Sequence, residues 1–273
     1  MQTRDGGSNL ARRTLSACVF VPAVVGLCMV GGWALYGLVV AVVGRGSWEL
    51  LHMARQAGRR PSLAVGILGA LACCTYLQVR GADAGLVLLL AGIVAVALVA
   101  ALRSGVQGFC GNAFLSLGAA LYLGLLGSAP LLLARRLGDE APWLLVAVFG
   151  CVWLTDSAAY GAGRAWGRRR LVPSISPGKT VVGLFAGLAG GLVPLALYPL
   201  LPAWSPAQLA GLLLLASAAG QVGDVVESAV KRDFGVKDAP PLIPGHGGLL
   251  DRFDSYLFAF PAAYVYTLVV RGT

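Results

Sequence analysis

The sequence of 273 residues has little charge: only 12% of its residues are Asp, Glu, Lys or Arg, whereas 58% are hydrophobic. A soluble domain carries about 25% charged residues, so this low fraction argues against a protein surrounded by water. Long polar stretches, and a basic module with interleaved aromatic residues, are missing too. These absences indicate a protein whose main solvent is lipid, with no nucleic acid among its partners.

Residues that commonly hold transition metals are also scarce. The chain has two histidines and six cysteines, and no cysteine forms a C-x-x-C pair or stands near a histidine. Neither a zinc site nor a disulfide framework is indicated. We expect the cysteines to pack inside apolar helices.

Long apolar runs fill most of the sequence. Crossing the hydrocarbon core of a bilayer takes about 20 apolar residues, and backbone polar groups in lipid must be satisfied within the segment, which favours helices. The nine candidate segments lie near residues 14–30, 33–54, 62–79, 84–102, 113–134, 142–162, 181–200, 207–230 and 254–270. The predicted fold is all-α, a polytopic integral membrane helical bundle with about nine transmembrane helices. Residues 1–273 form a single transmembrane domain, with 1–150 mainly membrane scaffold and 151–255 carrying the site.

Basic residues are distributed unequally between the two predicted membrane faces. With the N-terminus in the cytoplasm, sixteen lysines and arginines fall inside, and only Arg80, Arg135, Arg136 and Arg271 fall outside. This asymmetry follows the positive-inside rule. The net charge of +9 then belongs mainly to the cytoplasmic face, which suits anionic headgroups or an anionic soluble substrate.

Charge is concentrated in the stretch Gly223 to Ser255, which holds six of the twelve acidic residues and two of the three lysines. Asp224, Glu227, Ser228 and Lys231 recur there at intervals of three and four residues, so they share one helix face. The opposite face is apolar. This pattern favours a polar stripe facing the bundle interior or a cytoplasm-open cavity, although a water-facing amphipathic helix has the same periodicity.

Two further carboxylates follow a loop rich in proline and glycine. Asp251 and Asp254 are one helical turn apart, and the glycines around His246 let the backbone approach a ligand closely. Oxygen ligands suit Mg²⁺, and adding Asp224 gives a cluster that repels itself unless cations neutralise it. The pattern predicts a magnesium site. A set of Asp–Lys and Asp–Arg pairs at the membrane boundary is the alternative.

A second group of polar residues lies upstream. Asp156 interrupts an apolar segment, and a carboxylate at such depth is typical of a functional site, although pairing with the nearby Arg164 is an alternative. The run S-x-S-P-G-K-T at 174–180 places Lys179 just before the next apolar segment. Free N–H groups at a helix start beside an ammonium favour an anion. An ordinary helix cap uses the same residue types.

One charged pair lies in the N-terminal half. Arg45 and Glu49 are four residues apart and therefore on one helix face. We interpret them as an interfacial pair at the cytoplasmic end of a long helix. A supporting role for Glu49 near the site is the alternative.

These residues together resemble a known family. The charged signature is Ser228-x-x-Lys231-Arg232-x4-Lys237-Asp238 followed by Pro244-Gly245-His246-Gly247-Gly248-x-x-Asp251-Arg252-x-Asp254-Ser255. With Asp156-x-x-Ala159-Tyr160-x-x-Gly163-Arg164 and Ser176-Pro177-x-Lys179-Thr180, it resembles the pattern of phosphatidate cytidylyltransferases, also called CDP-diacylglycerol synthases. The sequence departs from that pattern at Gly178, Val182 and Pro240, where the family usually has a basic residue, a Glu or Gln, and a small residue.

The resemblance implies transfer of CMP from CTP to phosphatidic acid, giving CDP-diacylglycerol and pyrophosphate. It implies Mg²⁺, with a second cation left open, and a location in a bacterial inner membrane with the site facing the cytoplasm. The implied catalytic residues are Asp224, Lys231, Lys237, His246, Asp251 and Arg252. Substrate-binding residues would be Asp156, Tyr160, Arg164, Ser176, Lys179, Thr180, Ser228, Arg232, Gly245, Gly247 and Gly248. The implied metal ligands are Asp224, Glu227, Asp251 and Asp254. Partners would be CTP, phosphatidic acid and membrane lipids; a homodimer stays open.

Two other functions fit parts of the pattern. A cation-coupled transporter also has carboxylates inside a helical bundle, but usually near mid-membrane between related repeats. Here the carboxylates crowd one predicted boundary in one half of the chain. A non-catalytic lipid-binding scaffold explains the basic face but not the carboxylates.

Overall fold

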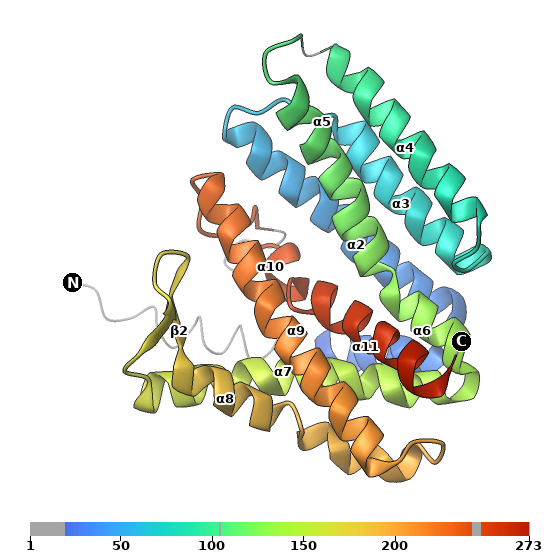
Figure 1. Cartoon of the computed structure of the whole chain (residues 1–273), viewed down its shortest axis with the longest axis vertical. Helices are drawn as coiled ribbons and strands as arrows, with labels where there is room; N and C mark the ends of the chain where they lie inside the picture. The colour runs from blue at the N-terminus through green and yellow to red at the C-terminus, as the bar shows by residue number, and fades with distance from the viewer. Residues whose placement is uncertain (1–19, 104, 242–246, 273) are drawn as a thin grey trace.

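The computed structural model describes residues 20–103, 105–241 and 247–272. Gly245 and His246 of the predicted site lie outside these residues. The described chain is predominantly helical (Figure 1).

Helices make up the N-terminal half up to residue 140. They are Phe20–Val30, then α2 (Gly32–Gln56), α3 (Leu63–Val79), α4 (Gly85–Leu102), α5 (Phe109–Gly118), the π-helix η1 (Ala119–Leu126), α6 (Ala129–Leu137) and the short 3₁₀ turn η2 (Gly138–Glu140). Helices α2 to α5 lie together on one side of the molecule (Figure 1).

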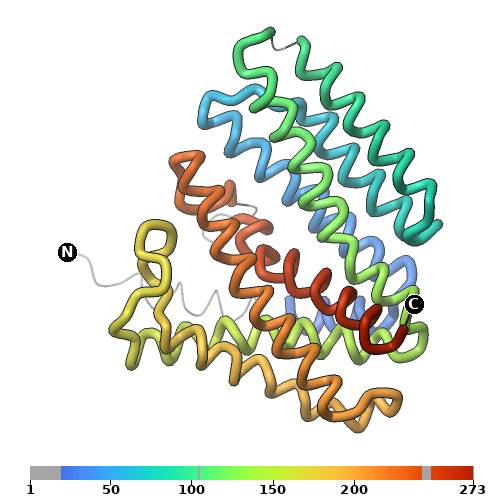
Figure 2. Tube along the Cα trace, viewed as in Figure 1, coloured from blue at the N-terminus to red at the C-terminus, as the bar shows by residue number. Residues whose placement is uncertain are grey.

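The C-terminal half adds longer helices and one β-hairpin. Its elements are α7 (Ala141–Trp166), β1 (Arg170–Val172), β2 (Ser176–Thr180), α8 (Val181–Gly190), the 3₁₀ helix η3 (Val193–Leu200), α9 (Pro206–Asp233), α10 (Leu250–Phe253) and α11 (Tyr256–Arg271). Helices α7 and α8 run side by side, and α9 crosses them before the chain returns through α11 (Figure 2).

The sequence predicted a loop before α8, and the structure has a β-hairpin there instead. Strands β1 and β2 are antiparallel, with Arg170 opposite Thr180 and Val172 opposite Ser176. The Thr180 side chain then accepts a hydrogen bond from the Gly183 N–H and caps α8. Because strand and cap are continuous, the hairpin holds Lys179 at the start of α8 and beside α9.

By length and composition, six helical stretches in the described ranges could cross a membrane. They are Gly32–Gln56, Gly85–Leu102, Phe109–Trp166, Val181–Leu200, Pro206–Asp233 and Leu250–Arg271. The apolar helices Phe20–Val30 and Leu63–Val79 are shorter. An all-α integral membrane protein is confirmed in outline, but the predicted count of about nine transmembrane helices is not. Two of the apolar helices are shorter than a bilayer crossing requires, and Phe109–Trp166 joins two of the predicted segments in one helical stretch.

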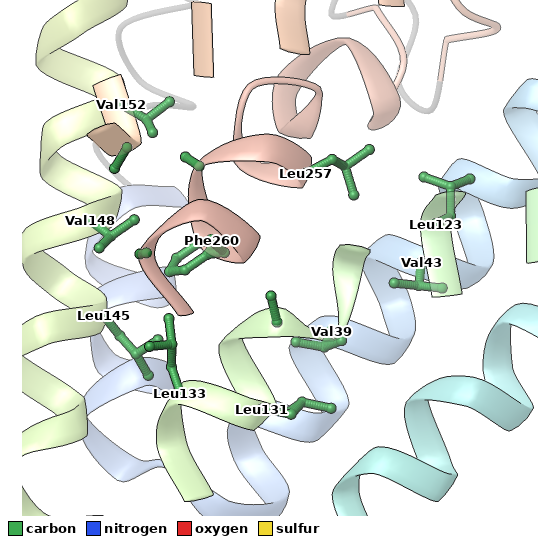
Figure 3. Packing of buried hydrophobic residues seen from close by; sticks show 14 of the residues in the cluster. Val39, Val43, Leu123, Leu131, Leu133, Leu145, Val148, Val152, Leu257 and Phe260 are labelled. Carbon is green, nitrogen blue, oxygen red and sulfur yellow. The ribbon is translucent and has the colours of Figure 1, made fainter. Parts of the chain in front are cut away.

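Helix α11 lies at the centre of the apolar core. It contacts α6, α7, α9 and η1, and Figure 3 shows its Leu257 and Phe260 between side chains of α7, such as Val148, and those of α2 and η1, such as Leu123. Phe260 also packs edge-on against Phe149, with ring centroids 4.9 Å apart. The core therefore holds the start of α11, and α10 just before it, in a fixed place.

Glycine allows a close backbone contact between two helices of the N-terminal half. A Cβ added to Gly124 of η1 would lie 2.8 Å from the Cα of Ala70 on α3. Small residues permit such approaches in membrane bundles, where dispersion forces and not hydrophobic burial hold helices together.

Replacing Gly124 by Ala should therefore destabilise the bundle by about 1–3 kcal/mol, because the added methyl group meets rigid backbone. Thermal unfolding of the detergent-solubilised protein measures this loss. The matched control is Gly92→Ala on α4, whose added Cβ would meet no atom within 4 Å. Equal melting temperatures for the two variants would contradict the close packing of η1 on α3.

Candidate active site

The polar stripe of α9 faces the protein interior. Glu227 is buried, with 1% of its surface exposed, whereas Val222 on the apolar side is 53% exposed. The inward-facing arrangement predicted from the spacing is therefore confirmed for α9. An apolar helix side turned outward is what a lipid environment favours.

Lys231 joins α9 to α10. Its Nζ lies 2.5 Å from Oε2 of Glu227 and 2.7 Å from Oδ1 of Asp251. The Lys231 side chain is only 12% exposed, so both pairs are largely shielded from water. A single ammonium thus pairs with carboxylates from two separate elements.

Asp251 also closes the loop that precedes α10. Its Oδ2 accepts hydrogen bonds from the backbone N–H groups of Ala239, at 3.0 Å, and Gly248, at 3.1 Å. Both oxygens of the carboxylate are thereby engaged. Asp251 consequently fixes the two ends of the loop relative to each other.

The β-hairpin brings a second lysine to the same region. Lys179 Nζ lies 2.7 Å from Oδ2 of Asp224 and 3.4 Å from the carbonyl oxygen of Gln221. The Lys179 side chain is 21% exposed and that of Asp224 is 35% exposed. This pair is more open to solvent than the Lys231 pairs.

The carboxylates form one electrostatic cluster. The charge of Asp254 interacts with those of Asp224, Glu227 and Asp156, and Lys179 acts on Asp156 as well as on Asp224. Asp254 is 8% exposed and accepts a hydrogen bond from the Ser255 N–H. Five acidic side chains from α7, α9 and the α10 region therefore gather around two lysines.

A cavity of about 530 Å³ opens beside this cluster. Its charged lining residues are Asp156, Asp251, Arg252 and Asp254, and Gly247, Gly248 and Leu249 line it as well. The remaining lining residues are mostly apolar and come from the first helix, α7 and the start of α11: Phe20, Val21, Val24, Val25, Val146, Phe149, Gly150, Trp153 and Tyr256. The lining is therefore amphipathic, with charged groups that suit an anionic head and apolar side chains that suit a hydrocarbon chain.

The chemical types of the possible ligand atoms suit a hard cation. All side-chain acceptors in the cluster are carboxylate oxygens, which suit Mg²⁺, and Oε1 of the buried Glu227 has no hydrogen-bond partner among the described residues. The present spacing is different: in the described ranges no three Asp, Glu, His or Cys side chains are close enough together to hold a metal. The Asp–Lys pairs that the sequence left as an alternative are formed. The magnesium ligands stay a prediction.

Comparison with known proteins identifies the family. The sequence model of the cytidylyltransferase family matches residues 11–270. The chain belongs to the cytidylyltransferase family. Phosphatidate cytidylyltransferases of Bacillus subtilis (strain 168) and Staphylococcus aureus (strain COL) are 48% identical over 121 residues and 45% identical over 128 residues. These alignments cover 42% and 45% of this chain and 45% and 48% of the relatives, so the chain spans about half the length of the curated relatives it matches.

The other predicted site residues lie in different parts of the structure. Arg164 donates to the Tyr160 hydroxyl at 3.1 Å, and no ion pair joins Arg164 to Asp156 in the described part of the chain. Ser228 donates to Asp224 at 3.4 Å, and Arg252 and Gly247 line the cavity.

Four predicted residues have structural contacts or lie at the surface. Arg232 donates to the carbonyl oxygens of Ile175 and Val236 and so ties the hairpin to α9. Thr180 is buried as the cap of α8. Ser176 is half-buried in β2, and Lys237 is exposed.

The interfacial interpretation of Glu49 is wrong. Its side chain is fully buried, and its carboxylate accepts hydrogen bonds from the backbone N–H groups of Leu249 and Leu250. The pair with Arg45 does form, at 2.8 Å. The interpretation failed because its partners are backbone groups about 200 residues away, and these have no side-chain signature.

Removing Lys231 should destabilise this family member strongly. In Lys231→Met, the buried Glu227 carboxylate loses its counter-charge, which costs about 3–5 kcal/mol. Denaturation in detergent micelles measures the loss, and Lys237→Met is the matched control because Lys237 is exposed.

A double variant separates charge from packing. Adding Glu227→Gln to Lys231→Met removes the uncompensated charge at position 227 and should recover part of the lost stability. If Lys231→Met is as stable as Lys237→Met, the buried ion pairs of Lys231 do not stabilise the fold as predicted.

Proposed function

We propose that this protein transfers CMP from CTP to phosphatidic acid and releases pyrophosphate. An oxygen of the lipid phosphate forms a bond to the α-phosphorus of CTP, and the bond from that phosphorus to the bridging oxygen of the β-phosphate breaks. CDP-diacylglycerol and pyrophosphate are the products. The family membership and the names of the relatives support this proposal.

The amphipathic cavity is the observation that carries the proposal. Its apolar lining residues, mainly from the first helix and α7, suit acyl chains, and its charged lining residues include Asp251, Arg252 and Asp254. A soluble phosphoryl acceptor would have no use for so large an apolar wall. A phospholipid has both parts in one molecule.

No side-chain nucleophile is required, because the lipid phosphate is already an anion. The barrier then falls mainly through alignment of the two substrates and neutralisation of charge. Lys179 and Lys231 are placed to exchange carboxylate partners for phosphate oxygens when CTP binds. Arg252 at the cavity wall and Arg232 beside the hairpin are further candidates for phosphate contacts.

Mg²⁺ is proposed as the cofactor, with Asp224, Asp251 and Asp254 as ligands and Glu227 as an additional ligand. A bound metal would neutralise negative charge on the triphosphate and on the leaving pyrophosphate. Lys179 and Lys231 would hold the carboxylates in place in the metal-free protein. Their release from the carboxylates would accompany binding of metal and nucleotide.

The proposed location is a bacterial inner membrane with the site facing the cytoplasm. The relatives compared here are bacterial, and most lysines and arginines fall on the predicted cytoplasmic side. CTP is a cytoplasmic nucleotide, so a cytoplasmic site gives it direct access.

The proposal predicts Mg²⁺-dependent pyrophosphate release from CTP only when phosphatidic acid is present. Asp251→Asn should lower kcat about 100-fold or more, because one oxygen is lost from a carboxylate that the reaction needs. A coupled pyrophosphate assay in mixed micelles measures both effects. The charge-matched control is Asp83→Asn, an exposed carboxylate in the turn between α3 and α4, which should keep wild-type turnover.

Two results would contradict this proposal. One is a wild-type protein without turnover in the presence of both substrates and Mg²⁺. The other is an Asp251→Asn protein with unchanged turnover.

A further inference from the structure

Glu49 of α2 is a charged residue for which the proposed reaction has no role. Its side chain is fully buried, and it belongs to the N-terminal half, far in sequence from the cluster of acids and lysines. Its Oε1 accepts from the Leu249 N–H at 3.0 Å and its Oε2 from the Leu250 N–H at 2.8 Å. A buried carboxylate is stable only with such partners.

These two N–H groups lie at the start of α10. The first N–H groups of a helix have no acceptor inside the helix, so a carboxylate that binds two consecutive ones fixes the direction in which the helix begins. Asp251 is the next residue after Leu250. The orientation of Asp251, and of Arg252 beside it, is therefore set partly from α2.

Arg45 holds the Glu49 carboxylate in position. Its Nε lies 2.8 Å from Oε1 of Glu49, and its guanidinium lies over the Trp48 ring, 4.2 Å from the centroid. Its Nη2 also lies 3.5 Å from the carbonyl oxygens of Pro240 and Pro241, which are long contacts. The pair thus reaches both ends of the loop that Asp251 closes.

Gly248 shows how closely the loop lies on this carboxylate. A Cβ added there would be 2.7 Å from Oε2 of Glu49 and 2.5 Å from Cβ of Ala239. Only glycine fits at this distance. Backbone and carboxylate therefore have little freedom to shift relative to each other.

We propose that Glu49, held by Arg45, is a positioning residue for the transfer reaction. It acts through the backbone of Leu249 and Leu250 and fixes Asp251 relative to Lys231 and the cavity. This inference rests on the proposed function. It predicts that loss of the Glu49 acceptors lowers the rate of transfer more than it weakens binding of CTP. The reason is that a small displacement of reacting groups can lower a reaction rate about 100-fold.

The test combines steady-state kinetics with hydrogen–deuterium exchange. Glu49→Gln keeps the side-chain shape but replaces one acceptor oxygen by an NH₂ group. We expect kcat to fall about 10- to 100-fold while KM for CTP changes less than about 3-fold. In the wild type, the amides of Leu249 and Leu250 should exchange slowly, and in Glu49→Gln they should exchange faster.

The matched control is Glu140→Gln. Glu140 pairs with Arg271 at 2.8 Å and accepts from Trp204 Nε1 at 3.1 Å, so it too is a glutamate bound to an arginine near a tryptophan. Arg271 ends α11, whose 16 residues place it about 24 Å from the start of that helix. Glu140→Gln should keep wild-type kcat and wild-type exchange at Leu249 and Leu250, even if its melting temperature falls.

Arg45→Lys gives an independent variant if Glu49→Gln does not fold. It keeps the positive charge but loses the planar fork of donors. It should lower kcat too, by a smaller factor than Glu49→Gln does. Wild-type kcat in both folded variants, or fast exchange of Leu249 and Leu250 in the wild type, overturns the inference. A wild-type protein without transfer activity would instead overturn the proposed function.

Discussion

The pairing of buried carboxylates with two lysines is the interaction on which the site depends. Acidic side chains are costly inside an apolar helical bundle unless opposite charges lie beside them. Lys231 lies against Glu227 and Asp251, and Lys179 lies against Asp224. Such pairs do not make the protein more stable than an apolar core would. Their value is that they keep charged groups inside a membrane protein. In the proposed reaction these groups would exchange their partners for charges of the ligand.

The fold brings this cluster together from distant parts of the chain. The hairpin supplies Lys179, α9 supplies Asp224, Glu227 and Lys231, and α10 supplies Asp251. Helix α11 is anchored in the apolar core by Leu257 and Phe260, and α2 contacts α10. Helix contacts thus hold the charged lining residues of the cavity, whereas most of its apolar lining residues come from the first helix and α7. In the proposed reaction, such a site would bind both the head and the chains of a phospholipid.

Features with a local period could be predicted from the sequence. The spacing of Asp224, Glu227 and Lys231 placed these residues on one inward face of α9, and the apolar runs indicated a helical membrane protein. Contacts with backbone groups far away in the sequence could not be predicted. The partners of Glu49 are two N–H groups near residue 250, and the hairpin around Ser176 depends on pairing that no short motif specifies. The number of membrane crossings could not be predicted from the apolar runs alone either, because a helix such as Leu63–Val79 is apolar but short.

Following the α-phosphate of CTP tests the central claim most directly. With CTP labelled at the α-phosphorus, the purified protein, phosphatidic acid and Mg²⁺ should move the label into the chloroform-extractable lipid. With CTP labelled at the γ-phosphorus, the label should appear only in pyrophosphate. Label from the γ-position in the lipid would mean a kinase reaction, and no label in the lipid from either position would mean that the cluster does not serve phosphoryl-type transfer. Either outcome would contradict the account.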